Sequence, residues 1–393
     1  MSLKRLKELQ GRIAEAGIDV VAILYSRDLY YFTGTAQPCV LLVSPREFHL
    51  FIRRGYERAV ADTGNWLEPR HLSNEGRLDA VANKLREWKI TEGVLGMELD
   101  TTPAEIYLEW QKLLPEFRLV DISPLVLEQR KTKDVEEIAC IRQACNIVDA
   151  GHRRALEVLR EGITELEFAA AIEDAHRRAG HEGLSFFRRP DFFMSRGPVG
   201  SGANLMTASG IVYSIAGVGM SAALPVGPSM KKIEKGEPIV IDIPTLYQGY
   251  HGDQSRTYVM GKASDGLRSL HSGLKDISDR IISNMTPGKT CKELFHLAWG
   301  RARELKVDDC FMSFGKRRNT NFIGHGVGLE CNEPPMLAAN DNSKLEVGYT
   351  LALDIHMLRE GVGAVKLEDT ILVTETGAEI LTLSPRELFE VGG

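Results

Sequence analysis

The chain has 393 residues, of which 43% are hydrophobic and 26% charged, and its formal net charge is -6. This length is too great for one small domain and suits two, and the hydrophobic fraction is large enough for a sizeable core. The negative charge gives no basic surface for nucleic acid, and no apolar run approaches the roughly 20 residues that cross a bilayer. We therefore expect neither a nucleic-acid partner nor a membrane partner.

The amino terminus and the cysteines together indicate the compartment. The first 17 residues, MSLKRLKELQGRIAEAG, have the pattern of an amphipathic helix and lack the apolar core of a secretory signal. The six cysteines are scattered without Cys-x-x-Cys pairs, as is usual for reduced thiols. We therefore expect a cytoplasmic protein.

Short helices and strands alternate over roughly the first 120 residues, which predicts an α/β domain. We expect helices over 4–16, 78–88 and 103–114, and strands over 20–24, 39–43, 48–52 and 94–97. This part contains no phosphate-binding glycine loop, and we expect no chemistry of its own there. A charged stretch without strand pattern, 125–133, marks the boundary, so we predict domains over 1–128 and 129–393.

The second domain begins with clear helix signals. Asp134 with Glu137, and Thr164 with Glu167, have the spacing of capping boxes, which start helices running to about residues 159 and 179. The stretch 183–230 is rich in Gly, Ser and Pro and predicts short strands and loops. Further helices are expected over 266–285 and 291–305, and strands over 322–325, 351–357 and 365–373.

Two carboxylates near an apolar run point to bound cations. Asp242 interrupts the apolar run 239–243, and Asp253 follows after a glycine-containing turn. A buried carboxylate is costly unless it has a partner, usually a cation or a metal ion. The pair therefore indicates a metal site.

The stretch around Asp242 has a partial copy later in the chain. Glu, Gly, Asp and Ile recur at matching offsets in 234–243 and 346–355, and the second copy places Asp354 where the first has Asp242. A second strand carrying an acid, Glu368, follows the later copy. This predicts two similar half-domains, each offering two carboxylates to a shared centre.

A histidine between glycines completes the candidate ligand set. The flanking glycines of His325 let the backbone come close to a ligand and leave the imidazole uncovered. Four carboxylates and one imidazole suit Mn(II), Co(II), Fe(II) or Zn(II) and do not suit copper or iron–sulfur chemistry. Any one of these acids alone is more often a hydrogen-bonded structural residue, whereas the five together favour a metal centre.

Several motifs resemble one known superfamily over nearly the whole chain. They are the stretch 242–257, the sequence GHGVGLE at 324–330, LEDT at 367–370, and the helix entry RKTKDVEEI at 130–138. In combination they resemble the methionine aminopeptidase, aminopeptidase P, prolidase and creatinase superfamily, peptidase family M24. The resemblance implies an α+β protein, with a pita-bread catalytic domain after an N-terminal α/β creatinase-like domain. The family's metal positions match Asp242, Asp253, His325, Asp354 and Glu368.

The resemblance also implies an activity. It is a metal-dependent hydrolase of the Xaa-Pro dipeptidase or aminopeptidase P type, in which two divalent ions (Mn, Co or Zn) activate a water molecule. The substrate would be a small peptide or a small-molecule amide, and family likeness implies a homodimer. Glu333 or Glu368 would transfer the proton during hydrolysis.

The chain departs from the family pattern at three positions. Asp354 stands where the family usually has Glu, and Val226 and Asn332 stand where it has histidines on the substrate side. Asn332 can donate a hydrogen bond to a developing oxyanion but cannot shuttle a proton. It joins Glu333 and Glu368 among the candidate catalytic residues.

Other polar residues near the motifs could also face the centre. His356 is two residues after Asp354 and His251 two before Asp253, so on a strand each shares a face with a candidate ligand. We count His356 as a catalytic candidate, although each is more often a supporting residue. Arg256 is expected to make structural pairs, and Tyr213 is a similar case.

Two other functions remain open. The missing histidines favour an enzyme of this fold that acts on a small non-peptide substrate, as a creatinase-like hydrolase or a lyase. A non-catalytic binding homologue is the third possibility. The complete ligand set argues against it, because a purely binding role need not retain five metal ligands.

Overall fold

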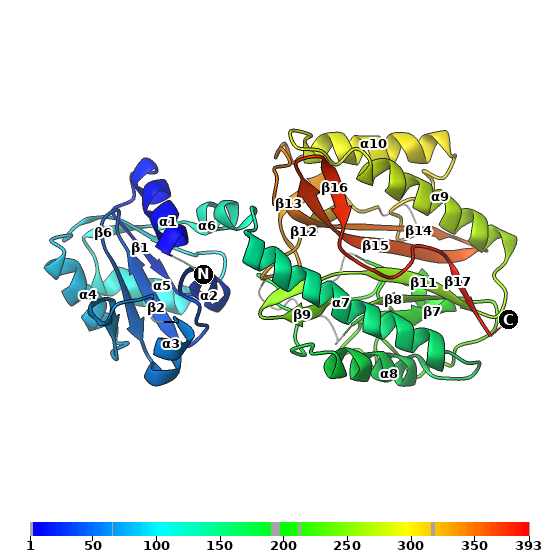
Figure 1. Ribbon diagram of the computed structural model, residues 1–393, viewed down its shortest axis with the longest axis horizontal. Coiled ribbons are helices and arrows are strands. Elements are labelled where there is room, and N and C mark those ends of the chain that lie inside the picture. The colour runs from blue at the N-terminus through cyan, green and yellow to red at the C-terminus, as the bar shows by residue number, and fades with distance from the viewer. Residues whose placement is uncertain (1–2, 65, 190–196, 211–213, 316–318, 393) are drawn as a thin grey trace. The chain divides into compact units, whose positions relative to one another are not determined.

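The computed structural model describes residues 3–392 except 65, 190–196, 211–213 and 316–318. Its contacts divide the chain into two compact units, one reaching to Arg130 and including Arg188, the other starting at Lys131. The domain limits that we predicted, 1–128 and 129–393, lie close to this division and remain a proposal. Figure 1 shows both units with most of their helices and strands labelled.

The first unit is built on one six-stranded sheet with the order β4-β3-β2-β1-β5-β6. The strands are β1 (Val20–Ile23), β2 (Cys39–Val43), β3 (Phe48–Ile52), β4 (Leu72–Ser73), β5 (Gly93–Met97) and β6 (Phe117–Asp121). The helices are α1 (Leu3–Glu15), α2 (Ser26–Thr33), α3 (Tyr56–Asp62), α4 (Leu78–Glu87), α5 (Ala104–Leu113) and α6 (Ser123–Arg130). Every element that we predicted here is confirmed, while residues 125–130 of the charged boundary stretch form most of α6. That helix end is fixed by a buried ion pair in which Arg130 donates to Asp28 at 2.7 Å.

The helices of the second unit begin where the sequence predicted. They are α7 (Val135–Val158), α8 (Glu165–Arg178), α9 (Asp265–Ile282) and α10 (Cys291–Glu304). Both predicted capping boxes form, at Asp134 and at Thr164, and Thr290 makes a third that we did not predict. Each box satisfies backbone N–H groups that a helix start leaves without partners.

A nine-stranded sheet forms the centre of the second unit. Its order is β13-β12-β14-β15-β11-β8-β7, with β16 paired to β15 and β17 to β11. The strands are β7 (Val199–Ser201), β8 (Pro238–Asp242), β11 (Ser255–Met260), β12 (Phe322–Gly326), β13 (Glu333–Ala338), β14 (Thr350–Arg359), β15 (Gly363–Thr374), β16 (Gly377–Ile380) and β17 (Phe389–Val391). A separate hairpin of β9 (Thr245–Tyr247) and β10 (Tyr250–Gly252) lies in the connection from β8 to β11.

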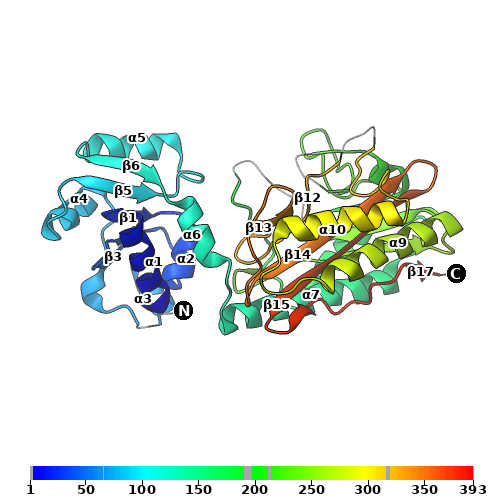
Figure 2. The same cartoon turned by 90° about the horizontal axis from the view of Figure 1, so that it is seen from above.

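The residues of β14 and β15 alternate between two environments. The odd-numbered apolar residues pack with α9 and α10 in one hydrophobic core, which includes Leu351, Leu353, Ile355, Val365 and Leu367. A second core joins α7 and α8 to β8 and β11. Figure 2 shows α9 and α10 lying across β14 and β15. Because side chains alternate across a strand, the even-numbered residues point to the sheet face away from these helices.

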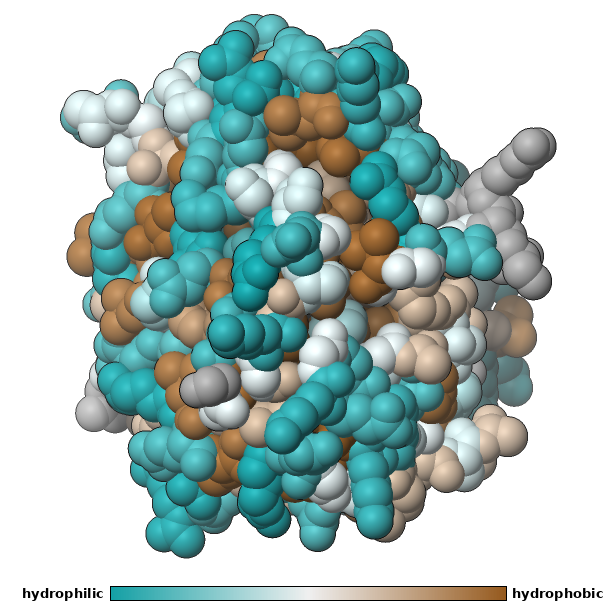
Figure 3. Space-filling model, turned by 90° about the vertical axis from the view of Figure 1, so that its right-hand side faces the viewer, coloured by the Kyte–Doolittle hydropathy of each residue, from teal (hydrophilic) through white to brown (hydrophobic). Residues whose placement is uncertain are grey.

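The face of the molecule drawn in Figure 3 is mainly hydrophilic, with smaller hydrophobic patches between the hydrophilic side chains. Within the part of the chain that the structure describes, no helix is both long and apolar enough to cross a membrane.

Candidate metal centre

Strand register brings three of the predicted ligands into one row. Asp354 on β14 pairs with Glu368 on β15, Glu368 pairs with Ser255 on β11, and Ser255 pairs with Asp242 on β8. Residues paired across neighbouring strands project from the same face of the sheet. The carboxylates of Asp354, Glu368 and Asp242 therefore meet on the face that the helices leave open.

The register refines the internal repeat that the sequence indicated. The repeat treated Asp253 and Glu368 as equivalent, but the residue opposite Asp242 is Ser255, not Asp253. Asp253 lies just before β11, where its N–H donates to Thr370 Oγ1 at 2.9 Å. The two halves differ because the β9–β10 hairpin occupies the connection in the first half only.

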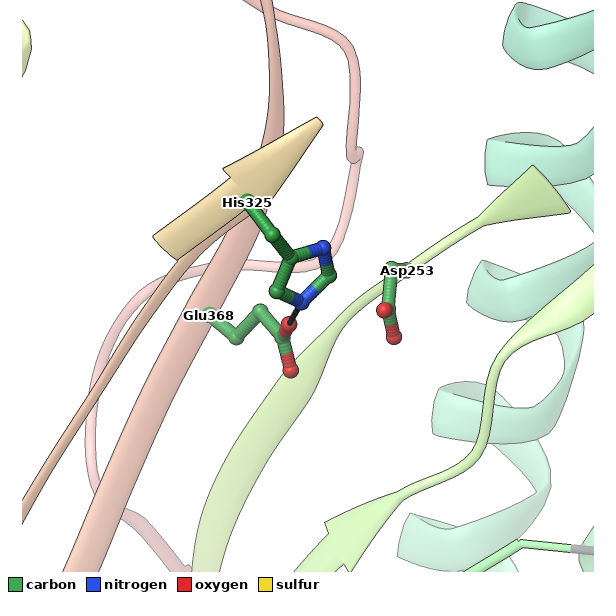
Figure 4. A group of neighbouring side chains, drawn as sticks. All are labelled: Asp253, His325 and Glu368. Carbon is green, nitrogen blue, oxygen red and sulfur yellow. Dashed lines mark ion pairs between the residues drawn. The ribbon is translucent and has the colours of Figure 1, made fainter. Parts of the chain in front are cut away.

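Asp253, His325 and Glu368 form a compact buried group. One ligand atom from each lies within 4.8 Å of the others, and among the described residues this is the group found suited to a metal ion. Figure 4 shows the three side chains pointing into a common space, with His325 Nε2 3.9 Å from Glu368 Oε1. His325 on β12 pairs with Ala352 on β14, and the imidazole reaches across β14 toward Glu368 on β15.

Asp253 has a free oxygen in this group. Its Oδ2 accepts a hydrogen bond from the Cys331 thiol at 3.1 Å, while its Oδ1 is buried without a hydrogen-bond partner. Burial, reinforced by the nearby Asp242 carboxylate, raises the pKa of Asp253 to about 6. Burial also raises the pKa of Glu368 well above its usual value, with Asp253 adding to the effect. An excess of buried carboxylates with a free oxygen is what a bound cation would stabilise.

A lysine that we did not predict lies among the same carboxylates. Lys366 Nζ is 2.5 Å from Asp242 Oδ2, 3.2 Å from Asp354 Oδ1 and 3.5 Å from Glu368 Oε2. Burial, the largest effect, lowers the pKa of Lys366, but the three carboxylates together outweigh it and raise the pKa well above its usual value. The period of two along β15 could have revealed this residue, since Lys366 shares a face with Glu368.

The acids and the lysine border a small cavity of about 50 Å³. All five predicted metal ligands line it, together with Lys366, Cys331, Asn332, Ser214 and several apolar residues. The structure thus brings the five residues to one place, while their role as ligands remains a proposal.

The remaining catalytic candidates are placed differently. Asn332 lines the cavity, whereas Glu333 and His356 are absent from its described lining. Glu333 accepts a buried hydrogen bond from Lys133 Nζ at 2.7 Å. His356 Nε2 lies 3.1 Å from Ser313 O, and burial lowers its pKa to about 3. Both residues therefore have structural partners away from the cavity.

His251 and Val226 are also buried. His251 Nε2 accepts the Phe186 N–H at 3.0 Å and its Nδ1 lies 2.9 Å from Gly328 O, so it joins loops rather than facing the cavity. Val226 is 1% exposed and is likewise absent from the described cavity lining.

Arg256 makes the structural pairs that we expected. It forms a buried ion pair with Asp369 at 2.6 Å and also donates to Glu368 O. Tyr213 lies outside the described residues.

The donor set fits one divalent ion. Asp253, His325 and Glu368 supply carboxylate oxygens and an imidazole nitrogen, the ligands preferred by Mn(II), Co(II) and Zn(II), and Asp253 Oδ1 lacks any other partner. Asp242 and Asp354 instead contact the ammonium group of Lys366.

Comparison with known proteins accounts for both units. Residues 139–375 match the description Metallopeptidase family M24, and residues 5–132 match Creatinase/Prolidase N-terminal domain. The chain is 30% identical to an Xaa-Pro dipeptidase of Pyrococcus furiosus, over 98% of this chain and 99% of the relative.

Solved structures agree with these matches. A structure described as Xaa-Pro dipeptidase from Bacillus anthracis has a TM-score of 0.84 at 26% identity, covering 99% of both chains. A structure described as X-Pro aminopeptidase from Thermotoga maritima has a TM-score of 0.80 at 25% identity, covering 98% of this chain and 99% of that one. The predicted fold class, a pita-bread catalytic domain after a creatinase-like domain, is confirmed, as is the prediction of a hydrolase. The chain belongs to metallopeptidase family M24.

Proposed function

We propose that this protein is a metal-dependent hydrolase that cleaves an Xaa-Pro bond or a related small amide bond. The observation that carries the proposal is the buried group of Asp253, His325 and Glu368, with its free Asp253 oxygen, on a family M24 fold. The relatives named Xaa-Pro dipeptidase, matched over almost their whole length, support the substrate class.

Four residues at the cavity have proposed tasks. A divalent ion, when bound, lowers the pKa of water and polarises a carbonyl oxygen. Asp253, His325 and Glu368 hold the ion, and Ser255 fixes Glu368 by donating to its Oε2 at 2.6 Å. Asn332 faces the cavity and donates a hydrogen bond to the oxygen that becomes negative during hydrolysis.

Of the two acids proposed for proton transfer, Glu368 is favoured. It borders the cavity, where the water to be activated would lie. Glu333 is engaged by Lys133 and does not border the cavity in the described lining.

The identity of the metal, the number of ions, the oligomeric state and the location rest on the family resemblance. We propose Mn(II), Co(II) or Zn(II) as the metal. The second ion expected from the sequence would depend on Asp242 and Asp354, whose carboxylates contact Lys366. A homodimer and a cytoplasmic location also remain proposals.

The Asp253→Ala variant tests the proposal. Protein loaded with Mn(II) and desalted is assayed for bound metal by mass spectrometry and for hydrolysis of Xaa-Pro dipeptides. We expect the variant to lose bound metal and at least about 100-fold in hydrolysis, since the ion supplies several kcal/mol of transition-state stabilisation.

Asp265→Ala is the matched control, because Asp265 has a fully exposed side chain at the start of α9. It is expected to keep wild-type metal and activity. Wild-type protein that retains no metal after loading would refute the proposal.

A second candidate is an enzyme of this fold acting on a small non-peptide amide. It is favoured by Asn332 in the cavity lining, at a position where a family histidine was expected. A substrate panel separates the two: hydrolysis of Xaa-Pro dipeptides supports the first function. Turnover confined to small cationic or cyclic amides supports the second, and metal binding without any turnover supports a binding homologue.

A further inference from the structure

We propose that the ammonium group of Lys366 takes the place of one metal ion, so that the centre binds a single divalent ion held by Asp253, His325 and Glu368. The proposal rests on the proposed function only in assuming that this centre binds metal. The sequence predicted two bound ions, and the proposal replaces them with one. It also assigns a role to Lys366, which the sequence did not indicate.

The contacts of Lys366 are those of a bound cation. Its Nζ lies within 3.5 Å of oxygens from Asp242, Asp354 and Glu368, and its side chain is 1% exposed. The Nζ donates a hydrogen bond to Asp242 Oδ2, while Asp354 and Glu368 contact it as ion pairs and Asp354 Oδ1 accepts no hydrogen bond. Asp242 and Asp354, two of the five residues expected to bind metal, thus already have a positive partner from the chain.

The position of Lys366 is fixed by the backbone around it. Its N–H donates to Thr257 Oγ1 at 2.8 Å, and the same hydroxyl donates to Lys366 O at 2.8 Å. Val365 and Leu367, its neighbours on β15, are both fully buried in the hydrophobic core. The Lys366 side chain therefore starts from a rigid strand and projects into the row of carboxylates.

Two separate sets of ligand atoms share Glu368. One set surrounds Lys366 Nζ, and the other consists of Asp253, His325 and Glu368, with ligand atoms within 4.8 Å of one another. Glu368 Oε2 faces the ammonium, while Glu368 Oε1 faces His325. One carboxylate can thus link an ammonium on one side to a metal ion on the other, as a bridging carboxylate links two metal ions.

Repulsion between cations also favours one ion. The cluster contains four carboxylates, of Asp242, Asp253, Asp354 and Glu368, and one ammonium. Its formal charge would be -1 with one divalent ion and +1 with two, so charge balance by itself allows either count. A second ion among Asp242 and Asp354 would meet the buried ammonium at close range, where repulsion between like charges is strong because little water screens it.

Displacing Lys366 would not relieve this conflict. Moving its ammonium away from the carboxylates would leave a buried charge without compensation, which costs several kcal/mol. The chain therefore retains its own cation in preference to a second metal ion.

The experiment counts metal ions in the intact protein. Wild type, Lys366→Met, Lys366→Arg and the exposed control Lys292→Met are saturated with Mn(II), desalted and measured by native mass spectrometry and elemental analysis. We expect about one ion per chain for wild type, Lys366→Arg and the control, and about two for Lys366→Met, because removing the charge opens a second site. Electron paramagnetic resonance should show isolated Mn(II) in wild type and a spin-coupled pair in Lys366→Met.

Two further variants keep the test decisive if Lys366→Met fails to fold. Asp354→Asn is expected to retain the single ion, because Asp354 faces the ammonium, while His325→Ala is expected to lose it. Loss of the ion from Asp354→Asn would overturn the inference.

The count in wild type separates the two proposals. About two ions per chain would overturn the single-ion inference and leave the metal-dependent hydrolase standing, since family enzymes can use a pair of ions. No bound ion would refute the proposed function itself. A folded Lys366→Met that still binds one ion would also overturn the inference.

Discussion

Charged side chains in an apolar sheet decide the chemistry of this protein at the scale of single residues. Asp242, Asp354 and Glu368 are each 7% exposed or less. Such groups are stable only with partners, and the chain supplies one in Lys366 and leaves Asp253 Oδ1 without any. The free oxygen marks where the chain requires a cation from outside.

Arg256 stabilises the strands that carry these carboxylates. Its guanidinium group pairs with Asp369 and donates to four backbone carbonyl oxygens, those of Ser255, Glu368, Ser384 and Pro385. One of these belongs to a proposed metal ligand. Arg256 therefore couples the stability of the sheet to the position of Glu368.

We predict that Arg256→Met lowers the free energy of unfolding by about 3–5 kcal/mol. The change leaves four backbone carbonyl oxygens without their donor and leaves Arg386 as the remaining cation beside Asp369. Chemical denaturation at neutral pH measures this. Arg256→Lys should recover only part of the loss, because an ammonium lacks the planar fork of donors.

The surface pair of Arg268, 45% exposed, provides the control. Arg268→Met should cost no more than about 1 kcal/mol. Equal losses for Arg256→Met and Arg268→Met would contradict a structural role for the buried arginine.

Strand register is the decisive property at the scale of elements. The pairing of β14, β15, β11 and β8 lines up Asp354, Glu368, Ser255 and Asp242 in one row. A shift of one residue would turn each acid into the hydrophobic core. The apolar alternation of β14 and β15 thus fixes the site as well as the core.

Helices α7 and α8 pack in close contact with each other. In α7, a Cβ added at Gly151 would lie 1.9 Å from His176 Nε2 in α8. His176 is 2% exposed and its Nε2 lies 3.3 Å from Val148 O, so the ring has little freedom to move away. Gly151 is what allows these two helices to pack.

We predict that Gly151→Ala destabilises the protein by about 1–3 kcal/mol through overpacking, although Ala is normally the better helix residue. Gly273→Ala is the matched control, because Gly273 lies inside α9 with no atom within 4 Å of an added Cβ. That change should stabilise the protein by about 0.5–1 kcal/mol. Thermal unfolding of both variants gives the comparison, and changes of the same sign would refute the packing argument.

Buried histidines make the stability of the whole folded protein depend on pH. Burial lowers the pKa of His152, His176 and His271 to about 4, so each stays neutral in the folded protein at neutral pH. In the unfolded chain a histidine takes up a proton near pH 6.5. The stability that each contributes is therefore complete above pH 6.5 and is lost progressively as the pH falls toward 4.

The variant His176→Gln isolates this effect, since it removes one buried titrating group. Between pH 6.5 and 4 we expect wild type to lose stability more steeply than the variant, by up to about 1.4 kcal/mol per pH unit. Urea unfolding of both proteins from pH 7.5 to 4.5 measures the difference. Parallel curves would show that His176 is not held neutral by burial.

The sequence alone determined a large part of this description. Hydrophobic periodicity located the main helices and strands, because burial imposes period 3.6 on helices and period two on strands. Capping pairs such as Asp134 with Glu137 fixed where helices begin, since those contacts are local. Motifs around Asp242, His325 and Glu368 identified the family before any coordinates were considered.

Only the tertiary structure decided how the charges are paired. The register that sets Ser255 rather than Asp253 opposite Asp242 depends on a hairpin between the strands. The contact of Lys366 with Asp242 joins residues 124 positions apart, and that of Lys133 with Glu333 joins residues 200 positions apart. No local pattern specifies such contacts, because they arise only when the sheet closes and each buried charge must find its partner there.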